Sequence, residues 1–286
     1  MFRALITWIT VLLIGGAALV TVPMPSPAET PANSAAQPSP KNSTSHDYDE
    51  EAERQLLEMT NEARAKTGVP GLAMDSGLAQ AARQHSSIMA AEQQLSHQFP
   101  WEPSLTERLA ETSGVHLDHE GENVAYAPSV VQSENGLMGS PEHRENILNP
   151  AFNIAGFGVV RRGSTLYVTE DFGHGLPIYS SRQAEHIVEQ NVAQMRRGFI
   201  LPQLHWADNA LAQNAACAMA KADSINAGSP YGRYVLRYTT MQPETLPASA
   251  AKAVQDPAVR GLGLGTCYAR TTTYPNGAYW VTLIFY

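Results

Sequence analysis

The fold is decided by the stretch Pro70-Gly-Leu-Ala-Met-Asp-Ser-Gly-Leu-Ala-Gln80, which returns in altered form as Pro202-Gln-Leu-His-Trp-Ala-Asp-Asn-Ala-Leu-Ala-Gln213. Both stretches read Pro-x-Leu and then Asp-x-x-Leu-Ala-Gln, with one residue inserted in the second, and both lead into an alanine-rich helical segment. Self-similarity of this kind indicates that one structural unit occurs twice. We therefore expect two tandem domains of the same fold.

The segments on either side of the repeated stretch also correspond. Upstream, the spacing of apolar residues in Leu56–Lys66 and Ile187–Arg197 predicts amphipathic helices that end in basic residues. Asp75 is the expected N-cap of the helix that follows. Downstream, each half ends in two strand-like runs, which predict hairpins with turns at Gly163 and at Asn276-Gly277.

The offset between the two halves changes along the chain. Asp208 follows Asp75 by 133 residues, whereas Leu262 follows Ala155 by only 107. The second half therefore lacks the difference, 26 residues, between its alanine-rich helix and its hairpin. We expect the second domain to be a version of the first that is shortened in the middle.

Composition and charge narrow the class of protein. The chain has 286 residues, 43% of them hydrophobic, which is enough for one large globular domain or two ordinary ones. Its net charge is −8, and its Lys and Arg residues form no cluster after residue 28. These features argue against binding to nucleic acid or to anionic membrane surfaces.

The N-terminal segment is predicted to direct export. Arg3 precedes an almost unbroken apolar run, Ala4–Val22, and Ser26-Pro27-Ala28 places small residues before a cleavage point after Ala28. Residues 1–28 are interpreted as a signal peptide or, if uncleaved, as a membrane anchor. Residues 29–47, rich in Pro and Ser, are predicted to be a disordered linker. The protein is thus expected to be secreted or extracytoplasmic, with membrane contact only through an uncleaved N-terminal segment.

Two cysteines occur in the chain, Cys217 and Cys267, both in the second half. An oxidising compartment would allow them to form a disulfide, and the alternative is two buried thiols that pack as small hydrophobic groups. The sequence leaves both alternatives open.

The chemically distinctive residues lie in the middle of the first half. They occur in three stretches, Leu95-Ser-His-Gln98, Gly121-Glu-Asn-Val-Ala125 and Ser140-Pro-Glu-His-Arg-Glu-Asn-Ile-Leu-Asn-Pro150. With these stretches, the chain from about Glu51 to Gly173 resembles the CAP superfamily (cysteine-rich secretory proteins, antigen 5 and pathogenesis-related 1 proteins) in its bacterial SCP-domain form. Residues 185–286 resemble the same domain only at their two ends.

The resemblance implies an α+β fold, a three-layer α-β-α sandwich that is present as two tandem copies. We expect a complete CAP/SCP domain over residues 48–178 and a shortened CAP-like domain, without the site residues, over residues 183–286. The second domain would then serve as a packing partner or as a surface for another protein.

The resemblance also implies a cleft lined by two histidines and two acidic residues. Matched position by position, His97 and His143 correspond to the histidines and Glu122 corresponds to one of the carboxylates. The second carboxylate has no clean match. Glu134 and Glu142 are the acidic residues that could replace it.

Two imidazoles and a carboxylate that face one hollow can hold a divalent cation such as zinc, with His97 and His143 as ligands. We expect a binding module for a small lipid-like, peptide or cell-wall ligand or another envelope component, with or without this cation. The alternative is a metal-assisted hydrolase acting on envelope or extracellular polymers. Since no serine or cysteine is marked as a nucleophile, catalysis is not indicated and no catalytic residue is assigned.

Each candidate residue also has a purely structural interpretation. The Gly-Glu-Asn sequence around Glu122 is typical of a turn that bonds backbone amides, and His97 could be a loop residue with an ordinary polar partner. Ser140 is expected to be a helix N-cap rather than a nucleophile, since proline follows it. His85 is expected to pack on an apolar helix face. The remaining histidines of the first half are expected to be solvated in polar loops: His116, His119 and His174.

Overall fold

The computed structural model describes residues 48–228 and 234–286. The predicted signal peptide or anchor, residues 1–28, and the predicted linker, residues 29–47, lie outside the described residues. Over the described ranges, no helix combines the length and the apolar composition that a membrane crossing needs.

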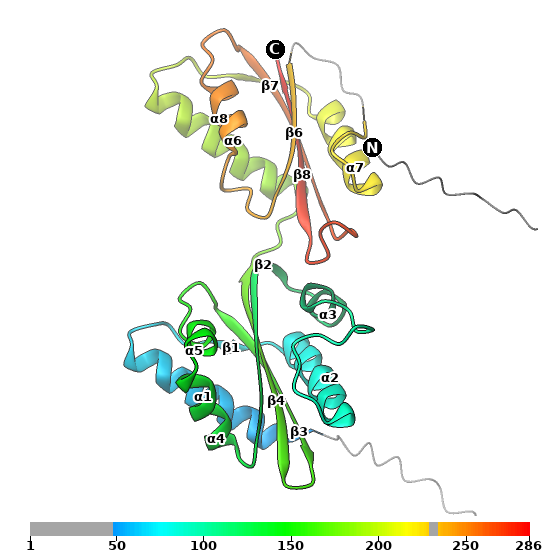
Figure 1. Ribbon diagram of the computed structural model, residues 1–286. Coiled ribbons are helices and arrows are strands. Elements are labelled where there is room, and N and C mark those ends of the chain that lie inside the picture. The colour runs from blue at the N-terminus through cyan, green and yellow to red at the C-terminus, as the bar shows by residue number, and fades with distance from the viewer. Residues whose placement is uncertain (1–47, 229–233) are drawn as a thin grey trace, which may run out of the picture. The chain divides into compact units, whose positions relative to one another are not determined.

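The first half of the described chain forms three layers. Its elements, in chain order, are α1 Glu50–Lys66, β1 Ala73–Met74, α2 Ser76–Glu92, α3 Leu105–Thr112, β2 His116–Ala127, α4 Val130–Gly139, α5 Pro141–Ile147, β3 Ile154–Arg162 and β4 Thr165–Leu176. The strands form one sheet in the order β1-β3-β4-β2, in which only the β1–β3 pair is parallel. Helices α1, α4 and α5 cover one face of this sheet, and α2 and α3 cover the other (Figure 1).

Local sequence signals account for where these elements begin and end. Asp75 is the N-cap of α2, as predicted, and its carboxylate accepts hydrogen bonds from the backbone amides of Gly77 and Leu78 at 3.0 and 2.9 Å. These amides have no partner within the helix, so the cap satisfies them. The hairpin of β3 and β4 turns at Gly163, whose φ of +62° favours glycine. The predicted turn position is confirmed.

The second half has the same arrangement in shorter form. Its elements are α6 Ser181–Gly198, β5 His205–Trp206, α7 Ala210–Ala222, β6 Tyr234–Thr240, α8 Ala248–Val254, β7 Gly261–Ala269 and β8 Ala278–Phe285. The sheet order is β5-β7-β8-β6, which matches the order in the first half. Helices α6 and α8 lie on one face and α7 on the other (Figure 1). The α+β prediction is therefore confirmed, and the described elements place the shortening between α7 and β7.

A buried arginine ties each half together at the same place. In the first half, the Arg64 guanidinium on α1 donates to the backbone carbonyls of Pro70, Ile147, Asn149 and Phe152. In the second half, Arg196 on α6 donates to the carbonyls of Pro202, Val254, Asp256 and Val259. A buried guanidinium needs several acceptors, and its fixed fork of N–H groups can reach them together. Each arginine clamp joins the end of the first helix to the segment before the hairpin.

Glycines let one helix of each half lie very close to the sheet. A Cβ atom added at Gly158 on β3 would lie 2.2 Å from the carbonyl carbon of Ala82 on α2. A Cβ atom added at Gly265 on β7 would lie 2.2 Å from the carbonyl carbon of Ala212 on α7. Both contacts are with helix backbone, which cannot rotate away as the end of a side chain does. This packing therefore requires glycine at matching positions of the two halves.

We expect Gly158→Ala to destabilise the protein by about 3 kcal/mol, the upper end of the usual cost of overpacking, because α2 would have to shift. Urea unfolding followed by circular dichroism measures the free energy of unfolding. Gly136→Ala is the matched control, since Gly136 lies in α4 with open space at its Cβ position. This methyl group should be neutral or stabilise by up to about 1 kcal/mol. Equal stabilities of the two variants would contradict the close-approach argument.

The two cysteines form a disulfide. Cys217 on α7 is bonded to Cys267 on β7, with a Cα–Cα distance of 5.1 Å and a sequence separation of 50 residues. Of the two alternatives that the sequence left open, the bridge is therefore the one that occurs. It joins a helix of the second half to the sheet beneath it.

The start of β2 contacts residues of the second half. His116 is fully buried, with Nδ1 3.0 Å from the carbonyl oxygen of Asn276 and Nε2 2.7 Å from that of Met241. Arg270 donates to the backbone carbonyls of Ala110, Ser113 and Val115. The prediction that His116 is solvated in a polar loop is wrong, because β2 extends through this polar sequence and its first residue is covered.

Candidate functional site

Glu122 lies inside β2 and not in the turn that its Gly-Glu-Asn sequence predicted. It is paired in the sheet with Asp171 on β4. Its Oε1 lies 2.9 Å from Nδ1 of His97, and its Oε2 accepts a hydrogen bond from Arg108. The turn prediction is wrong because pairing along the whole of β2 overrides the local preference of these residues.

His97 and His143 approach each other from different elements. His97 lies in the loop after α2, and His143 lies in the first turn of α5. Their ring centroids are 6.3 Å apart, with 31° between the ring planes. The His97 side chain is 56% exposed, so solvent reaches the pair. The structure brings together the three residues chosen from the sequence, and their role in binding stays a prediction.

A buried charged network supports Glu122. Arg108 on α3 is 6% exposed at its side chain and forms ion pairs with Glu102, at 2.8 Å, and with Glu122. His85 is fully buried beside them, with Nδ1 2.7 Å from Oε1 of Glu102 and Nε2 2.8 Å from the carbonyl oxygen of Ser96. His85 is thus packed as predicted, but within a polar network. A buried carboxylate needs a cation or hydrogen bonds, and Arg108 supplies both to Glu122.

Asn123 connects β2 to the helix that carries His143. Its Nδ2 donates to the backbone oxygen of His143 and to Oε2 of Glu170, both at 3.1 Å. Its Oδ1 accepts a hydrogen bond from Asn146 at 2.9 Å, and Asn146 also donates to the backbone oxygen of Glu122 at 3.2 Å. These bonds hold α5 against β2 and so fix where His143 lies relative to Glu122.

The fourth position of the predicted cleft stays unassigned. Glu134 on α4 is buried, accepts a hydrogen bond from Thr60 and lies next to Glu170. Burial raises the pKa of both carboxyls, and that of Glu170 lies well above its ordinary value. Glu142 is exposed, and its carboxylate accepts a hydrogen bond from the Ser140 hydroxyl at 3.4 Å.

The serines near the histidines have other partners. Ser140 occupies the N-cap position of α5 as predicted, but its hydroxyl makes no cap bond to the helix backbone. The Ser96 hydroxyl, next to His97 in the sequence, donates to the carbonyl oxygen of Gln98 at 2.8 Å. The hydrogen bonds of these two hydroxyl groups go to a carbonyl oxygen and a carboxylate, and neither bond joins a hydroxyl to a histidine that could activate it as a nucleophile.

The protonation of His143 suits metal binding. Burial lowers the pKa of His143, and the nearby His97 lowers it further. At neutral pH the ring is therefore uncharged. The uncharged imidazole is the form that binds a metal ion.

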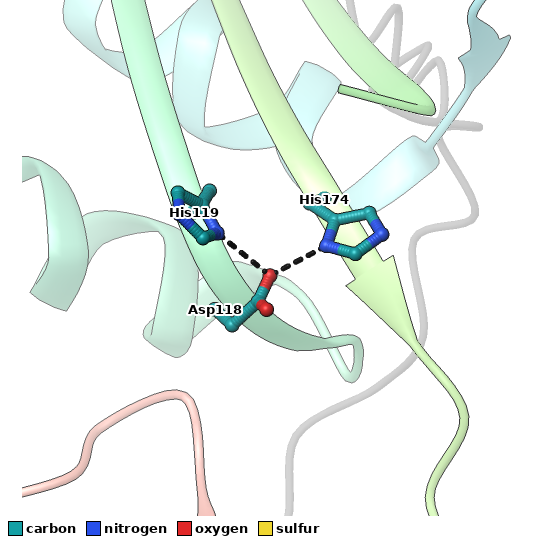
Figure 2. Close-up of side chains that lie close together, drawn as sticks. All are labelled: Asp118, His119 and His174. Atoms are coloured by element: carbon teal, nitrogen blue, oxygen red, sulfur yellow. Dashed lines mark hydrogen bonds and ion pairs between the residues drawn. The ribbon is translucent and has the colours of Figure 1, made fainter. Parts of the chain in front are cut away.

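A second group of ligand-type side chains lies near the start of β2. Figure 2 shows Asp118 and His119 from β2 and His174 from β4 pointing toward one another. Their candidate ligand atoms all lie within 4.8 Å of one another, and in the described part of the chain no other group of three His, Cys, Asp or Glu side chains does so. The prediction that His119 and His174 lie in loops is wrong, because both belong to paired strands. His119 is exposed to solvent, as predicted.

Asp118 is held as a carboxylate within this group. Its Oδ1 lies 2.6 Å from Nδ1 of His174 and 3.1 Å from Nδ1 of His119. Its Oδ2 accepts a hydrogen bond from Gln242 at 2.6 Å. Burial works against ionisation of Asp118, but these three hydrogen bonds outweigh it and hold the pKa of this carboxyl below its ordinary value.

Comparisons with known proteins find relatives of the first half of the chain. Residues 57–172 match the model of the cysteine-rich secretory protein family, CAP. The uncharacterized protein YkwD of Bacillus subtilis (strain 168) is 34% identical over 113 residues, which cover 39% of this chain and 44% of YkwD. The membrane protein YlbC of the same strain is 34% identical over 125 residues, which cover 42% of this chain and 34% of YlbC. The chain thus spans less than half the length of each of these relatives.

Among solved structures, a similar one is that of an extracellular protein containing an SCP domain from Bacillus anthracis str. Ames. Its sequence identity is 30% and its TM-score is 0.40, over 43% of this chain and 40% of that chain. The family match lies in the first half of the present chain and includes His97, Glu122 and His143.

Proposed function

Because residues 57–172 form a domain of the cysteine-rich secretory protein (CAP) family, we propose that this protein is an extracytoplasmic binding module whose ligand is held at His97, Glu122 and His143. The ligand is a small lipid-like, peptide or cell-wall molecule. A polar group of this molecule coordinates a zinc-class cation that is also bound by the two histidines. The observation that carries this proposal is the 2.9 Å contact between His97 Nδ1 and Glu122 Oε1.

That contact gives the two nitrogens of His97 different tasks. Since a carboxylate only accepts hydrogen bonds, Nδ1 carries the proton, and in the neutral ring Nε2 carries the lone pair. Histidines that bind metals usually donate their other N–H group to such a carboxylate. Glu122 is then a positioning residue, and His97 Nε2 and the His143 ring are the ligands.

The surroundings of the two histidines favour an exchangeable ligand. Two imidazoles fill two of the four positions of a tetrahedral zinc ion and leave the others to water or to atoms of a bound molecule. The exposure of His97 gives such a molecule access. The Ser96 hydroxyl already donates to a backbone carbonyl, which supports binding rather than covalent catalysis.

Calorimetric titration of the full chain with zinc near neutral pH tests this site. We expect His97→Ala and His143→Ala each to weaken zinc binding there by at least about 10-fold, because each removes a ligand. His205→Ala is the matched control, since it removes an exposed imidazole on β5, and it should bind zinc like the parent protein. Acidification should weaken binding as His143 takes up a proton.

Isotherms that stay unchanged in both His97→Ala and His143→Ala would place the cation elsewhere and contradict the proposed site. Circular dichroism of each variant checks that its fold is retained. A parent protein that binds no zinc at all would remove the cation from the proposal.

A further inference from the structure

A β-bulge near the start of β2 turns two consecutive side chains toward the same partner. Neighbouring side chains of a regular strand point to opposite faces of the sheet. Here Leu117 pairs with Gly175 and His119 pairs with His174 in the strand register. Asp118 is therefore an extra residue of β2 that stands opposite no residue of β4 in this register. A bulge of this kind re-aims the side chains around it. Asp118 and His119 can therefore both contact His174.

We propose that Asp118, His119 and His174 form a binding site for a zinc-class divalent cation, which is distinct from the site at His97 and does not depend on it. The closest separations between ligand atoms are 2.6 and 3.1 Å, and all lie within 4.8 Å of one another. Ligand atoms around tetrahedral zinc, with bonds of about 2.0–2.1 Å, lie roughly 3.3 Å apart. The two shortest separations are therefore about 0.2 and 0.7 Å below this value, in the arrangement without an ion.

The donor set selects the class of cation. Two imidazole nitrogens and one carboxylate oxygen suit zinc and neighbouring transition metals, whereas calcium and magnesium prefer oxygen ligands. The His119 side chain is 66% exposed and that of His174 is 30% exposed, so the site is open to entry of the ion. Three protein ligands leave one tetrahedral position to water or to a second molecule.

The second half of the chain supports this site through Gln242, which follows β6. The Gln242 side chain donates to Oδ2 of Asp118 at 2.6 Å, and this leaves Oδ1 for the cation. Gln242 and His174 also line a pocket of about 190 Å³. Outer-shell hydrogen bonds of this kind orient metal ligands. The second half, which lacks counterparts of His97, Glu122 and His143, thus contributes a positioning residue to a site on the first half.

The test isolates this site by removing the other one. The full chain with both His97→Ala and His143→Ala should still bind one equivalent of zinc in calorimetry, because the triad is intact. In that background, His174→Ala or Asp118→Asn should weaken binding by more than the roughly 10- to 100-fold that loss of an outer-shell partner costs, and Gln242→Ala should weaken it within that range. His205→Ala is again the control. Visible absorption of bound cobalt(II) should appear in the His97→Ala/His143→Ala chain and be lost when His174→Ala is added to it.

Absence of zinc binding in the His97→Ala/His143→Ala chain would overturn this proposal. An isotherm that His174→Ala and Asp118→Asn both leave unchanged would do the same, and circular dichroism checks that these variants fold. Failure of the proposed function looks different. The parent protein would then bind zinc in a way that is insensitive to His97→Ala but lost in His174→Ala.

Discussion

Replacing Arg108 with alanine should destabilise the protein by roughly 3–5 kcal/mol, the usual cost of removing one partner of a buried ion pair. Arg108 is the cation between the buried carboxylates of Glu102 and Glu122. Asp171, opposite Glu122 on β4, is also buried. Burial is the main cause that raises the pKa of the Asp171 carboxyl well above its ordinary value, and the charge of Glu122 raises it further. Arg108 lowers this pKa. Without the guanidinium, these acidic groups would lose the cation that they share.

The loss of stability caused by Arg108→Ala should increase with pH. Arg108 lowers the pKa of the Asp171 carboxyl, so the loss of Arg108 raises that pKa further in the folded state. A group whose pKa is raised on folding contributes stability at low pH and loses it as the pH rises through that value. Urea unfolding should therefore show a larger deficit for Arg108→Ala at about pH 8 than at about pH 5.

Arg54→Ala is the matched control for Arg108→Ala. Arg54 pairs with Glu51 on the exposed surface of α1, where the Arg54 side chain is 65% exposed. Loss of an exposed pair of this kind should change stability by no more than about 0.5 kcal/mol. Similar deficits for the two arginine variants, or a deficit that does not change with pH, would show that Arg108 does not act through the buried carboxylates.

Removing the disulfide should destabilise the second half by about 4 kcal/mol. Cys217 and Cys267 are 50 residues apart, and the entropy that a bridge takes from the unfolded chain grows with the length of the loop it closes. The double variant Cys217→Ala/Cys267→Ala removes the bridge without leaving a free thiol. Fluorescence of Trp280, which is buried on β8, reports unfolding of this half.

A reducing agent provides the control for the disulfide prediction. It should move the urea midpoint of the parent protein toward that of the double variant and leave the double variant unchanged. Intact mass after alkylation, with and without reductant, counts the thiols directly. A parent midpoint that does not respond to complete reduction would contradict the prediction.

Much of the fold follows from local signals in the sequence. Asp75 caps a helix because its carboxylate reaches amides two and three residues away, and Gly163 turns a hairpin because of its own φ angle. Such signals depend on near neighbours, so they can be read without the tertiary structure. The prediction of a turn at Gly-Glu-Asn was wrong because a distant part of the chain decides the structure there. Glu122 is held in a strand by pairing with Asp171 on β4, 49 positions away.

The site was predicted only in part. His97, Glu122 and His143 could be chosen because short motifs carry the family resemblance. Arg108 could not, since its partners come from other segments and nothing in its own neighbours marks it as buried.

His119 and His174 were missed for a related reason. Asp118 and His119 would face opposite sides of a regular strand, and only the pairing of β2 with β4 creates the bulge that brings them together.

The arginine clamps belong to a set of features that both halves of the chain have in common. Both halves keep the buried arginine, the glycines under the close-packed helix and the strand order, while the shorter half does without 26 residues of the middle segment. The two halves thus share these features although their middle segments differ in length. For protein engineering, this means that shortening the region between α2 and β3 in the first half would remove Arg108 and the candidate site residues, although the outer helices and the hairpin are shared by both halves.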